Sequence, residues 1–473
     1  MYRDREMQRF SVVITVLIFG ALCAFANGVP NGSEPVGGNI LLLVADDLGM
    51  DKIGIYGEHP GAPNTPNIDA LAARGVRFRN AYAPPSCSPA RASILTGRYG
   101  RRIGLGAWIR MGTFAFEVPP ATLMIPGMLD RYSPLKYDHA LVGKWHLAGF
   151  RSSPDLDHPR KLGFRRFSGS AGNLKASSQQ DGEVRGYYHW QKVTDGVASF
   201  VDEYATTVSV DDALAYIDEM SKPWFLMVAF NAAHPPLDIP PAELHSRSDE
   251  ELEDSIGKYD AMVEALDAEI GRLLSGIDPE VLADTTVIFM SDGGTLRSGT
   301  APPLNPKHAK QTIYEGGTNI PLIVAGPPVS APGSESDALV HVVDIFPTIA
   351  DIAGVHPDQL LDPNGKRLVL DGHTLLPFVR DPRLPSEREY LYTELFRGPG
   401  KPPYYFDARA VRDRRFKLIR RLSQPDELYD LQGRFDDGPN LLEAALNAEA
   451  QAAYQRLSLE LERLEKELTY DGF

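Results

Sequence analysis

Five short apolar runs, none with polar side chains at every second position, constrain the fold of this chain most strongly. A strand exposed on one face alternates apolar and polar residues, whereas a parallel strand buried on both faces is apolar throughout. The stretches between the runs carry helical periodicity, as at 211–220 and 255–274. This alternation predicts an α/β fold in which helices sandwich a largely parallel central sheet. The five runs are 40–45, 140–142, 225–230, 286–290 and 320–325.

Two further helices have start and end signals in the sequence. Thr65 before Pro66 is typical of a helix start, with threonine at the N-cap and proline at the first helical position. Ser88 before Pro89 gives the same signal. Because glycine is common just beyond a helix end, we expect these helices to end at Gly75 and Gly97.

The character of the sequence changes near residues 375–390, where X-Pro pairs mark a loop-rich junction. Alternating segments follow and predict a small antiparallel sheet, and a charged helix over 444–468 closes the chain. We therefore predict a main domain over 39–380 and a C-terminal subdomain over 381–473. The alternating segments are 390–394, 408–411, 416–420 and 428–431.

The first 26 residues have the pattern of a secretory signal peptide. Three arginines within the first nine residues precede an apolar stretch over 11–26 that ends in the sequence AFA. A membrane span needs about 20 apolar residues, so we favour cleavage after residue 26 over an uncleaved N-terminal anchor. Residues 27–38 would then be a linker. We expect an exported protein, periplasmic or extracellular, with no stable membrane span after cleavage.

Cysteine content and net charge exclude two classes of protein. Two cysteines cannot form a disulfide framework, and signal cleavage would leave Cys87 as the only thiol. The chain has 48 Lys and Arg against 63 Asp and Glu, for a formal net charge of −15. Non-specific nucleic-acid binding is excluded, because phosphate contacts require a basic face.

Ionisable side chains directly follow four of the five apolar runs. In an open parallel sheet, ligands bind outside the carboxyl ends of the strands, so we expect these side chains to converge on one crevice. Each one alone is typical of a turn, a helix cap or a solvated side chain. Their coincidence predicts a functional site. The residues are Asp46 and Asp47, Lys144 and His146, His234, and Asp292.

The aspartates of this set predict a metal site. Asp46, Asp47 and Asp292 supply hard oxygen ligands without a soft partner, which is typical of Ca²⁺ or Mg²⁺. Zinc is disfavoured, because His and Cys do not occur at zinc-ligand spacing.

Cys87 immediately precedes a predicted helix start. Free N–H groups and the helix dipole favour anions there, and Arg91 in the first turn faces the same point. The alternative is a small buried residue at a helix start, which composition leaves open.

The segment around Cys87 resembles the signature of the type I (formylglycine-dependent) sulfatases, in an arylsulfatase-like form. It reads CSPAR at 87–91 with LTGR at 95–98. Other motifs extend the resemblance from about residue 39 to residue 431. They are ADDLG at 45–49, NTPNID at 64–69, GKWHL at 143–147, HPP at 234–236, SDGG at 291–294, Lys310 with YEGG at 314–317, DIFPT at 344–348 and ELYDL at 427–431.

The resemblance implies an alkaline-phosphatase-like fold and the hydrolysis of sulfate esters. The catalytic sulfatase domain would span 39–380, and Cys87 would be oxidised to Cα-formylglycine by a formylglycine-generating maturation enzyme. One Ca²⁺ per chain, with Mg²⁺ less favoured, would be bound by Asp46, Asp47, Asp292 and the matured residue 87.

Roles in catalysis follow from the same resemblance. The hydrated formylglycine at 87 would attack sulfur, activated by Asp292 and stabilised by Arg91. His234, as general acid, and Lys310 would contact the sulfate and the leaving oxygen.

Lys144 and His146, which follow the apolar run 140–142, complete the set of catalytic residues that the resemblance implies. Lys144 would bind sulfate and position the nucleophile, and His146 would deprotonate the remaining hydroxyl of the geminal diol so that sulfate is released. Three carboxylates would be offset by Arg91, Lys144 and Lys310, so a divalent cation would leave the pocket positive.

Position 293 departs from the family pattern. The family carries Asp-Asn-Gly after the fourth strand, and the Asn gives a neutral oxygen to the metal, whereas Gly293 follows Asp292 here. Calcium accepts six to eight oxygens in flexible geometry. We therefore expect a functional site with weakened metal affinity.

Two alternatives to a sulfatase stay open. One is a phosphate mono- or diester hydrolase of the same superfamily, and the other is a degenerate protein that binds sulfated ligands without turnover. The expected substrate is a sulfated carbohydrate, with an aryl sulfate as the alternative. Selectivity would lie in the loops 98–118, 168–194, 295–308 and 397–406, whose candidate contacts are Arg101, Arg102, Trp108, His189, Trp190, Tyr404 and Tyr405.

Overall fold

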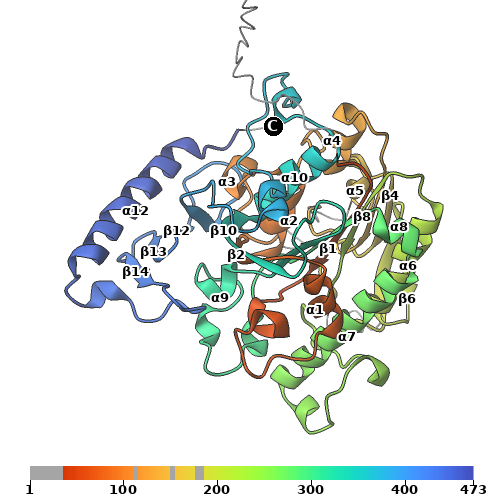
Figure 1. Ribbon diagram of the computed structural model, residues 1–473, viewed down its shortest axis with the longest axis horizontal. Helices are drawn as coiled ribbons and strands as arrows, with labels where there is room; N and C mark the ends of the chain where they lie inside the picture. The colour runs from red at the N-terminus through yellow and green to blue at the C-terminus, as the bar shows by residue number, and fades with distance from the viewer. Residues whose placement is uncertain (1–35, 110–115, 150–154, 176–185, 472–473) are drawn as a thin grey trace, which may run out of the picture. The chain divides into compact units, whose positions relative to one another are not determined.

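A mixed ten-stranded sheet forms the centre of the described structure. The computed structural model describes residues 36–109, 116–149, 155–175 and 186–471 (Figure 1). The strands of this sheet are β1 (Asn39–Ala45), β2 (Gly75–Tyr82), β3 (Asp138–Gly143), β4 (Arg166–Gly169), β5 (Trp190–Thr194), β6 (Val197–Val201), β7 (Trp224–Ala229), β8 (Thr285–Ser291), β9 (Leu322–Ala325) and β10 (Ser334–His341). Their order is β10-β2-β9-β8-β1-β7-β3-β4-β5-β6.

Four of the five predicted apolar runs form neighbouring parallel strands. β1 lies between β7 and β8 and is parallel to both, with Leu42 opposite Met227 and Ile288. β3 continues the parallel set beyond β7. These strands are buried along their whole length, as their composition predicts.

The fifth run is a strand whose direction was predicted wrongly. β9 is antiparallel to both of its neighbours, β2 and β8. All four of its residues are buried. An uninterrupted apolar run therefore reports burial on both faces, and it does not report strand direction.

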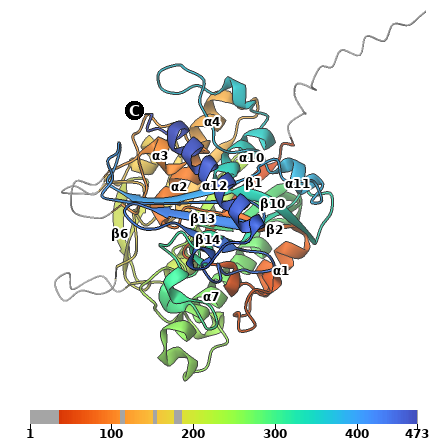
Figure 2. The ribbon, with the colours of Figure 1, turned by 90° about the vertical axis from the view of Figure 1, so that its left-hand side faces the viewer.

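Helices cover both faces of the sheet (Figure 2). α2, α4 and α10 share one hydrophobic core with the sheet, and α1, α6 and α7 share the core on the opposite face. The helices are α1 (Pro66–Ala73), α2 (Cys87–Thr96), α3 (Gly100–Ile103), α4 (Ile125–Tyr132), α5 (His158–Lys161), α6 (Ala205–Glu219), α7 (Ser255–Gly276), α8 (Pro279–Ala283), α9 (Glu315–Thr318), α10 (Ile345–Ile352), α11 (Leu376–Arg380) and α12 (Ala448–Glu467).

The start of α1 is capped differently from the prediction. Thr65 occupies the N-cap position, but its hydroxyl accepts a hydrogen bond from the backbone N–H of Gly54 at 3.2 Å. The N–H groups of Asn67 and Ile68 donate instead to the carboxylate of Asp267 in α7, at 3.1 and 2.7 Å. A side chain about 200 residues away in the sequence thus satisfies this helix end.

The start of α2 lies two residues earlier than predicted. Ser86 is at the N-cap and Cys87 is the first helical residue. The hydroxyl of Ser88, predicted as the cap, accepts a hydrogen bond from the N–H of Ile109 at 3.1 Å. The predicted end is confirmed, because Gly97 follows Thr96 in the left-handed conformation, at φ 69°.

The predicted small antiparallel sheet and closing helix are confirmed. β11 (Leu391–Arg397), β12 (Phe406–Arg412), β13 (Phe416–Arg421) and β14 (Glu427–Asp430) pair antiparallel in chain order. α12 lies beside this sheet (Figure 1), and its apolar side chains share a hydrophobic core with those of the sheet.

A buried ion cluster joins the small sheet to the large one. Glu315 in α9 accepts hydrogen bonds from Lys417 Nζ at 2.8 Å and Arg412 Nη1 at 3.3 Å, and Tyr82 of β2 donates to the same carboxylate. Glu315, Lys417, Arg412 and Tyr82 are all buried. Although burial acts in the opposite direction, Lys417 and Arg412 lower the pKa of Glu315.

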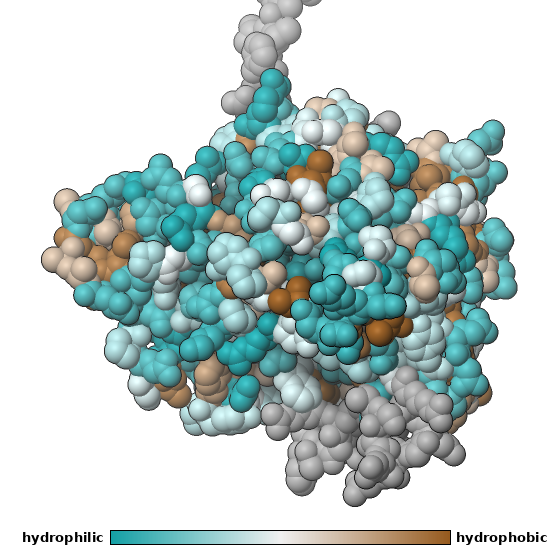
Figure 3. All heavy atoms as spheres, turned by 90° about the horizontal axis from the view of Figure 1, so that it is seen from below, coloured by the Kyte–Doolittle hydropathy of each residue, from teal (hydrophilic) through white to brown (hydrophobic). Residues whose placement is uncertain are grey.

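β6 is an edge strand with exposed apolar side chains. Val197 is 70% and Phe200 48% exposed. The sequence analysis predicted none of the strands β2, β4, β5, β6 and β10, and of these β6 lacks a buried face altogether. On the face drawn in Figure 3, hydrophilic side chains predominate and apolar ones form small scattered groups.

The predicted signal peptide, residues 1–26, lies outside the described residues, as does most of the 27–38 linker. The domain boundary near residue 380 stays a prediction. Among the described residues, none of the helices is both long enough and apolar enough to span a membrane.

Candidate active site

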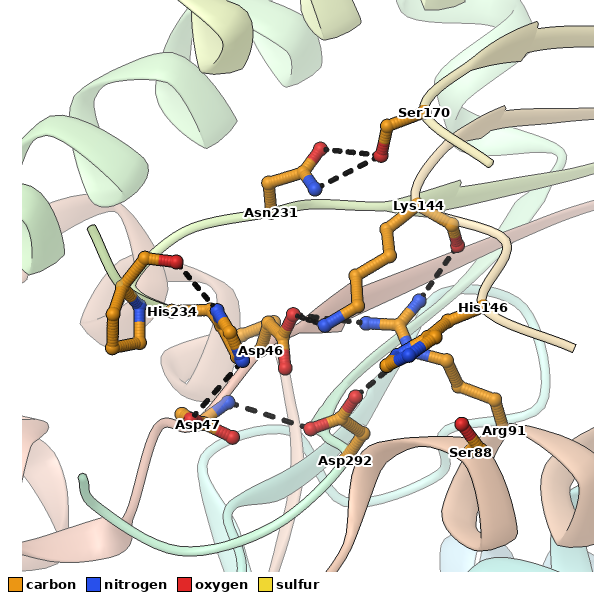
Figure 4. Close-up of polar contacts among 12 residues, drawn as sticks. Asp46, Asp47, Ser88, Arg91, Lys144, His146, Ser170, Asn231, His234 and Asp292 are labelled. Carbon is orange, nitrogen blue, oxygen red and sulfur yellow. Dashed lines mark hydrogen bonds and ion pairs between the residues drawn. The ribbon is translucent and has the colours of Figure 1, made fainter. Parts of the chain in front are cut away.

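Ionisable side chains from four loops meet at the carboxyl edge of the parallel strands (Figure 4). Asp46 and Asp47 follow β1, Lys144 and His146 follow β3, His234 follows β7, and Asp292 follows β8. α2 adds Cys87 and Arg91, and the loop before α9 adds Lys310. The structure thus brings all the predicted site residues together at the position expected for a ligand in a parallel sheet.

Asp46 is fully buried against Lys144. The ammonium of Lys144 donates to Asp46 Oδ2, while Asp46 Oδ1 has no hydrogen-bond partner. Burial, followed by the like charge of Asp292, raises the pKa of Asp46. Asp46 thus presents an unpaired carboxylate oxygen in a site where isolated charge is costly.

Asp292 is held by two cations. Arg91 Nε donates to its Oδ2 at 2.8 Å, and Lys310 Nζ donates to its Oδ1 at 2.9 Å. Burial acts to raise the pKa of Asp292, but Lys310 and Arg91 outweigh it and hold the pKa well below the usual range. Asp292 is therefore ionised at neutral pH.

Lys310 also reaches the first loop of the site. Its Nζ lies 2.8 Å from Asp47 Oδ1, although this oxygen accepts no well-aligned hydrogen bond. Burial alone would lower the pKa of Lys310, but Asp292 and Asp47 raise it well above the ordinary value. Lys310 is thus a fixed cation between two carboxylates.

Cys87 lies beside the carboxylates at the start of α2, with 5% of its surface exposed. Burial raises the pKa of its thiol despite the nearby lysines. Because the thiolate is the reactive form of cysteine, the unmodified thiol is a weak nucleophile and a weak metal ligand here.

His146 is held as a neutral imidazole with one free ring nitrogen. Its Nε2 lies 3.2 Å from the carbonyl oxygen of Ile109, so Nε2 carries the proton and donates. Its Nδ1 is buried without a hydrogen-bond partner. Burial, reinforced by Lys144 and Arg91, lowers the pKa of His146 well below its ordinary value. Nδ1 is therefore available as a base.

His234 has the opposite ring orientation. Its Nδ1 lies 2.7 Å from the carbonyl oxygen of Pro235 and donates to it, so Nε2 faces Asp47 Oδ2 at 4.0 Å (Figure 4). The hydroxyl of Tyr187 lies 2.6 Å from the carbonyl of Asn231 and 2.8 Å from that of His234. Tyr187 thus holds the loop that carries His234.

Backbone strain is concentrated at this site. Of the five non-glycine residues with positive φ in the described ranges, Asp47 and His146 belong to the site, both at 58°, and Gln311 at 68° follows Lys310. Such conformations cost about 1–3 kcal/mol each and persist only where surrounding contacts impose them.

Gly293 makes room for Lys310. A Cβ atom at position 293 would lie 2.1 Å from Lys310 Nζ and 2.7 Å from its Cε. The side chain of Lys310 therefore fills the space that an asparagine at 293 would enter. The position that lacks a neutral oxygen ligand carries an ammonium group instead.

The donor set of the site fits a divalent cation. One ligand atom each from Asp46, Asp47, Cys87 and Asp292 lies within 4.8 Å of the others, and all four residues are buried. Three carboxylates, including the unpaired Asp46 Oδ1, are the oxygen ligands that Ca²⁺ and Mg²⁺ prefer.

Four residues that the sequence analysis did not name support the site. Ser170 and Asn231 hydrogen-bond to each other beside Lys144 (Figure 4). Tyr187 supports the His234 loop, and the hydroxyl of Tyr259 in α7 donates to the carbonyl of Asp47. Asn231 directly follows the apolar run 225–230 and could have been marked by it, whereas none of the five runs or the motifs directly precedes the other three residues.

Several residues predicted as substrate contacts pack inside the protein instead. Arg101 is paired with Asp407 at 2.6 Å and stacks on the rings of Phe396 and Tyr404. Tyr404 and Trp190 are also buried.

The other predicted contacts differ in their surroundings. Arg102 is paired with Asp371, and His189 with Asp202. Tyr405 is 76% exposed at the tip between β11 and β12. Trp108 is partly buried and precedes Ile109, whose carbonyl contacts His146.

Residues 38–355 match the family model described as Sulfatase. The chain belongs to the sulfatase family. Residues 307–467 match a second model, N-sulphoglucosamine sulphohydrolase, C-terminal. The enzyme is accordingly a sulfuric ester hydrolase.

Individual relatives cover most of this sulfatase. It is 30% identical to N-acetylgalactosamine-6-sulfatase of Homo sapiens over 393 residues, which are 77% of this chain and 70% of the human one. The solved structure of Ps i-CgsB in complex with k-i-k-neocarrahexaose is 26% identical, with a TM-score of 0.71 over 90% of this chain and 92% of that one.

The fold extends beyond sulfatases. The structure of the phosphonate monoester hydrolase of Agrobacterium radiobacter gives a TM-score of 0.65 at 21% identity, over 92% of this chain and 96% of that one. The predicted alkaline-phosphatase-like architecture is confirmed.

Proposed function

We propose that this sulfatase hydrolyses sulfate esters of a carbohydrate, using a formylglycine made from Cys87 and one divalent cation. The observation that carries the proposal is the convergence of Cys87 with three buried carboxylates and three buried cations at one strand edge. The carbohydrate class is supported by two similar proteins, an N-acetylgalactosamine-6-sulfatase and a structure in complex with k-i-k-neocarrahexaose. An aryl sulfate is the alternative substrate.

Asp46, Asp47, Asp292 and the matured residue 87 would hold the cation. We favour calcium over magnesium, because the oxygen ligands come from three separate segments and calcium tolerates irregular geometry. When bound, the cation supplies charge stabilisation for the reacting oxygens. Gly293 lacks an oxygen and admits Lys310, so metal affinity is weakened.

Three residues prepare the nucleophile. Oxidation of Cys87 to an aldehyde and its hydration give a geminal diol, which can expel sulfate by re-forming the aldehyde, whereas serine cannot. Asp292, ionised by its contacts with Arg91 and Lys310, accepts the proton of the attacking hydroxyl. Arg91 stabilises the hydrate.

The histidines and lysines handle the sulfate group. Lys144 and Lys310 bind its oxygens, and His234 Nε2 protonates the leaving oxygen as the ester S–O bond breaks. The free Nδ1 of His146 then takes the proton of the remaining hydroxyl, so that the aldehyde re-forms and sulfate leaves.

The proposal includes export. Residues 1–26 would be a signal peptide, and the mature enzyme would lie in the periplasm or outside the cell. A formylglycine-generating maturation enzyme is then a required partner. A Cys87→Ala variant exported normally but without activity is expected.

Peptide mass spectrometry across residue 87 tests the central step. An aldehyde in protein from the native host is expected, and an unmodified thiol there would overturn the mechanism. Cys87→Ala should abolish hydrolysis, while Arg383→Ala, at an exposed position, is the matched control and should leave it unchanged.

The two alternatives are separated by substrate. Equal or faster hydrolysis of an aryl phosphate than of the matching aryl sulfate would favour a phosphate ester hydrolase; a phosphonate monoester hydrolase has a similar fold. Saturable binding of a sulfated saccharide with no turnover by aldehyde-bearing protein would identify a binding protein.

A further inference from the structure

Asp47 is the proposed metal ligand whose backbone is strained. It directly follows β1 and lies at φ 58°, in the left-handed region that residues other than glycine seldom occupy. A conformation of this kind costs about 1–3 kcal/mol and persists only where neighbouring contacts hold it. The direction of the Asp47 carboxylate therefore depends on what fixes the backbone at this residue.

The two adjacent ligands of the first loop are held by different elements. Asp46 continues the backbone pairing of β1, because its N–H and its carbonyl bond to the segment 232–233 at 2.9 and 2.8 Å. The N–H of Asp47 instead donates to Asp292 Oδ1 at 3.4 Å (Figure 4). The carbonyl of Asp47 accepts a hydrogen bond from the hydroxyl of Tyr259 in α7. Helix α7 thus holds the Asp47 backbone through one side chain.

The side chain of Tyr259 has little freedom to move. It is fully buried, and a Cβ atom on Gly299 would lie 2.5 Å from its ring, so the ring packs directly on the Gly299 backbone. The next residue, Asp260, is paired with Lys52 at 2.7 Å, and both are buried. Lys52 belongs to the same connection after β1 as Asp47. The hydroxyl of Tyr259 is therefore fixed relative to the segment that it contacts.

Loss of this contact would change where the Asp47 carboxylate points. Without the hydroxyl, the backbone of Asp47 can relax towards an ordinary conformation, and a change in φ turns the Cα–Cβ bond with it. A carboxylate oxygen of Asp47 now lies within 4.8 Å of the ligand atoms of Asp46, Cys87 and Asp292. A turn of the Asp47 backbone would raise the cost of bringing these four donors to one cation.

We propose that Tyr259 is a positioning residue for the metal ligand Asp47. Its hydroxyl holds the left-handed backbone of Asp47, and this directs the carboxylate towards the other ligands. The inference rests on the proposed function, because it requires that these carboxylates bind a divalent cation.

Tyr259→Phe and calorimetric titration of the chelator-treated enzyme with Ca²⁺ test the proposal. The substitution removes one oxygen atom and keeps the buried ring. Removing a group that orients a metal ligand typically weakens metal binding by about 10–100-fold. We expect the dissociation constant for Ca²⁺ to rise about tenfold, because Tyr259 contacts the backbone of the ligand and not its carboxylate.

Tyr137→Phe is the matched control. Tyr137 is also buried, and its hydroxyl donates to the carbonyl of Gly38 at 3.0 Å, directly before the start of β1. This bond lies at the end of β1 opposite the site. Both variants lose a buried tyrosine hydroxyl bonded to a backbone carbonyl, so their melting temperatures should fall by similar amounts. Only Tyr259→Phe should weaken Ca²⁺ binding.

A second variant displaces the hydroxyl without deleting it. The Cβ added by Gly299→Ala would push the ring of Tyr259, so this variant should also weaken Ca²⁺ binding. Wild-type Ca²⁺ affinity in both Tyr259→Phe and Gly299→Ala, or an equal loss in Tyr259→Phe and Tyr137→Phe, would refute the positioning role and leave the metal site standing. A wild type that binds neither Ca²⁺ nor Mg²⁺ would refute the metal site itself, and this inference with it.

Discussion

Gly293 has no side chain, and this leaves room for the side chain of Lys310 beside it. Lys310 Nζ occupies the space beside Gly293 and contacts Asp47 and Asp292, two of the proposed metal ligands. A cation bound by these carboxylates competes with the ammonium group for the same oxygens. We therefore expect Gly293 to weaken metal affinity in two ways, by withholding an oxygen and by admitting a positive charge.

Gly293→Asn should bind calcium about tenfold more tightly than the wild type, or on the order of 1.4 kcal/mol. Isothermal titration of metal-free protein with Ca²⁺ measures this directly. Gly293→Ala is the matched control, because its Cβ displaces Lys310 but offers no oxygen, and it should give a smaller gain. No gain with asparagine would sink the idea that a ligand is missing.

Tyr187 is the second residue whose role can be isolated. Tyr187→Phe removes the hydroxyl that supports the carbonyls of Asn231 and His234, and we expect kcat to fall about tenfold with KM little changed. The loss should be larger for a sugar sulfate than for a nitrophenyl sulfate, because a good leaving group needs less protonation by His234.

Tyr188→Phe is the control for this prediction, since its hydroxyl donates to the carbonyl of Ile239 outside the site. An equal loss in both variants, or a loss independent of the leaving group, would assign Tyr187 a purely structural role.

The sequence predicted the residues of the site better than the contacts among them. Asp46, Asp47 and Asp292 could be placed together because each follows an apolar run, and strand ends meet at one edge. Tyr187 could not be placed at the site in this way. Its hydrogen-bond partners are backbone carbonyls, and every residue has one, so the sequence does not indicate the contact. The same limit hid the contact between Lys310 and Gly293.

At the scale of elements, the sequence predicted the strands and helices in which buried positions carry apolar residues in a recognisable pattern. β1, β3, β7 and β8 are buried throughout and each contains an uninterrupted apolar run, and the α6 and α7 patterns are amphipathic. β6 was missed because an exposed edge strand carries no such pattern. Strand direction was beyond the sequence, as β9 demonstrates.

The cap of α1 belongs to α7, and its contribution can be measured. Asp267→Ala should lower the free energy of unfolding by about 2–3 kcal/mol, because the N–H groups of Asn67 and Ile68 lose a buried, charged acceptor. Denaturant unfolding followed by circular dichroism is the measurement.

Asp254→Ala provides the comparison, since this residue caps α7 locally through one bond to the Gly257 N–H and should cost about 1 kcal/mol. If Asp267→Ala lowers the free energy of unfolding no more than Asp254→Ala does, the long-range cap stabilises the protein no more than a local cap.

At the scale of the whole molecule, Glu315 ties the small sheet to the large one. Glu315→Gln removes the carboxylate nearest to the buried Lys417 and Arg412, leaving Asp437 at 3.5 Å from Lys417, and should cost about 3–5 kcal/mol at pH 7. Because the pKa of Glu315 is lowered on folding, its contribution is present above the ordinary value of 4.5 and is lost as the pH falls below it.

The difference in unfolding free energy between the wild type and Glu315→Gln should therefore shrink from pH 7 towards pH 3. Glu449→Gln, in an exposed pair with Arg415, should change stability by less than about 1 kcal/mol at either pH. A pH-independent difference for Glu315→Gln would contradict the assignment.

Within the described part of the chain no strand pairs with the outer edge of β6, and this has a practical consequence for anyone concentrating the protein. Val197 and Phe200 stand on the last strand of the sheet, whose outer backbone groups can pair with another chain. Self-association at high concentration should begin there, and a lysine at position 197 would keep the preparation monodisperse.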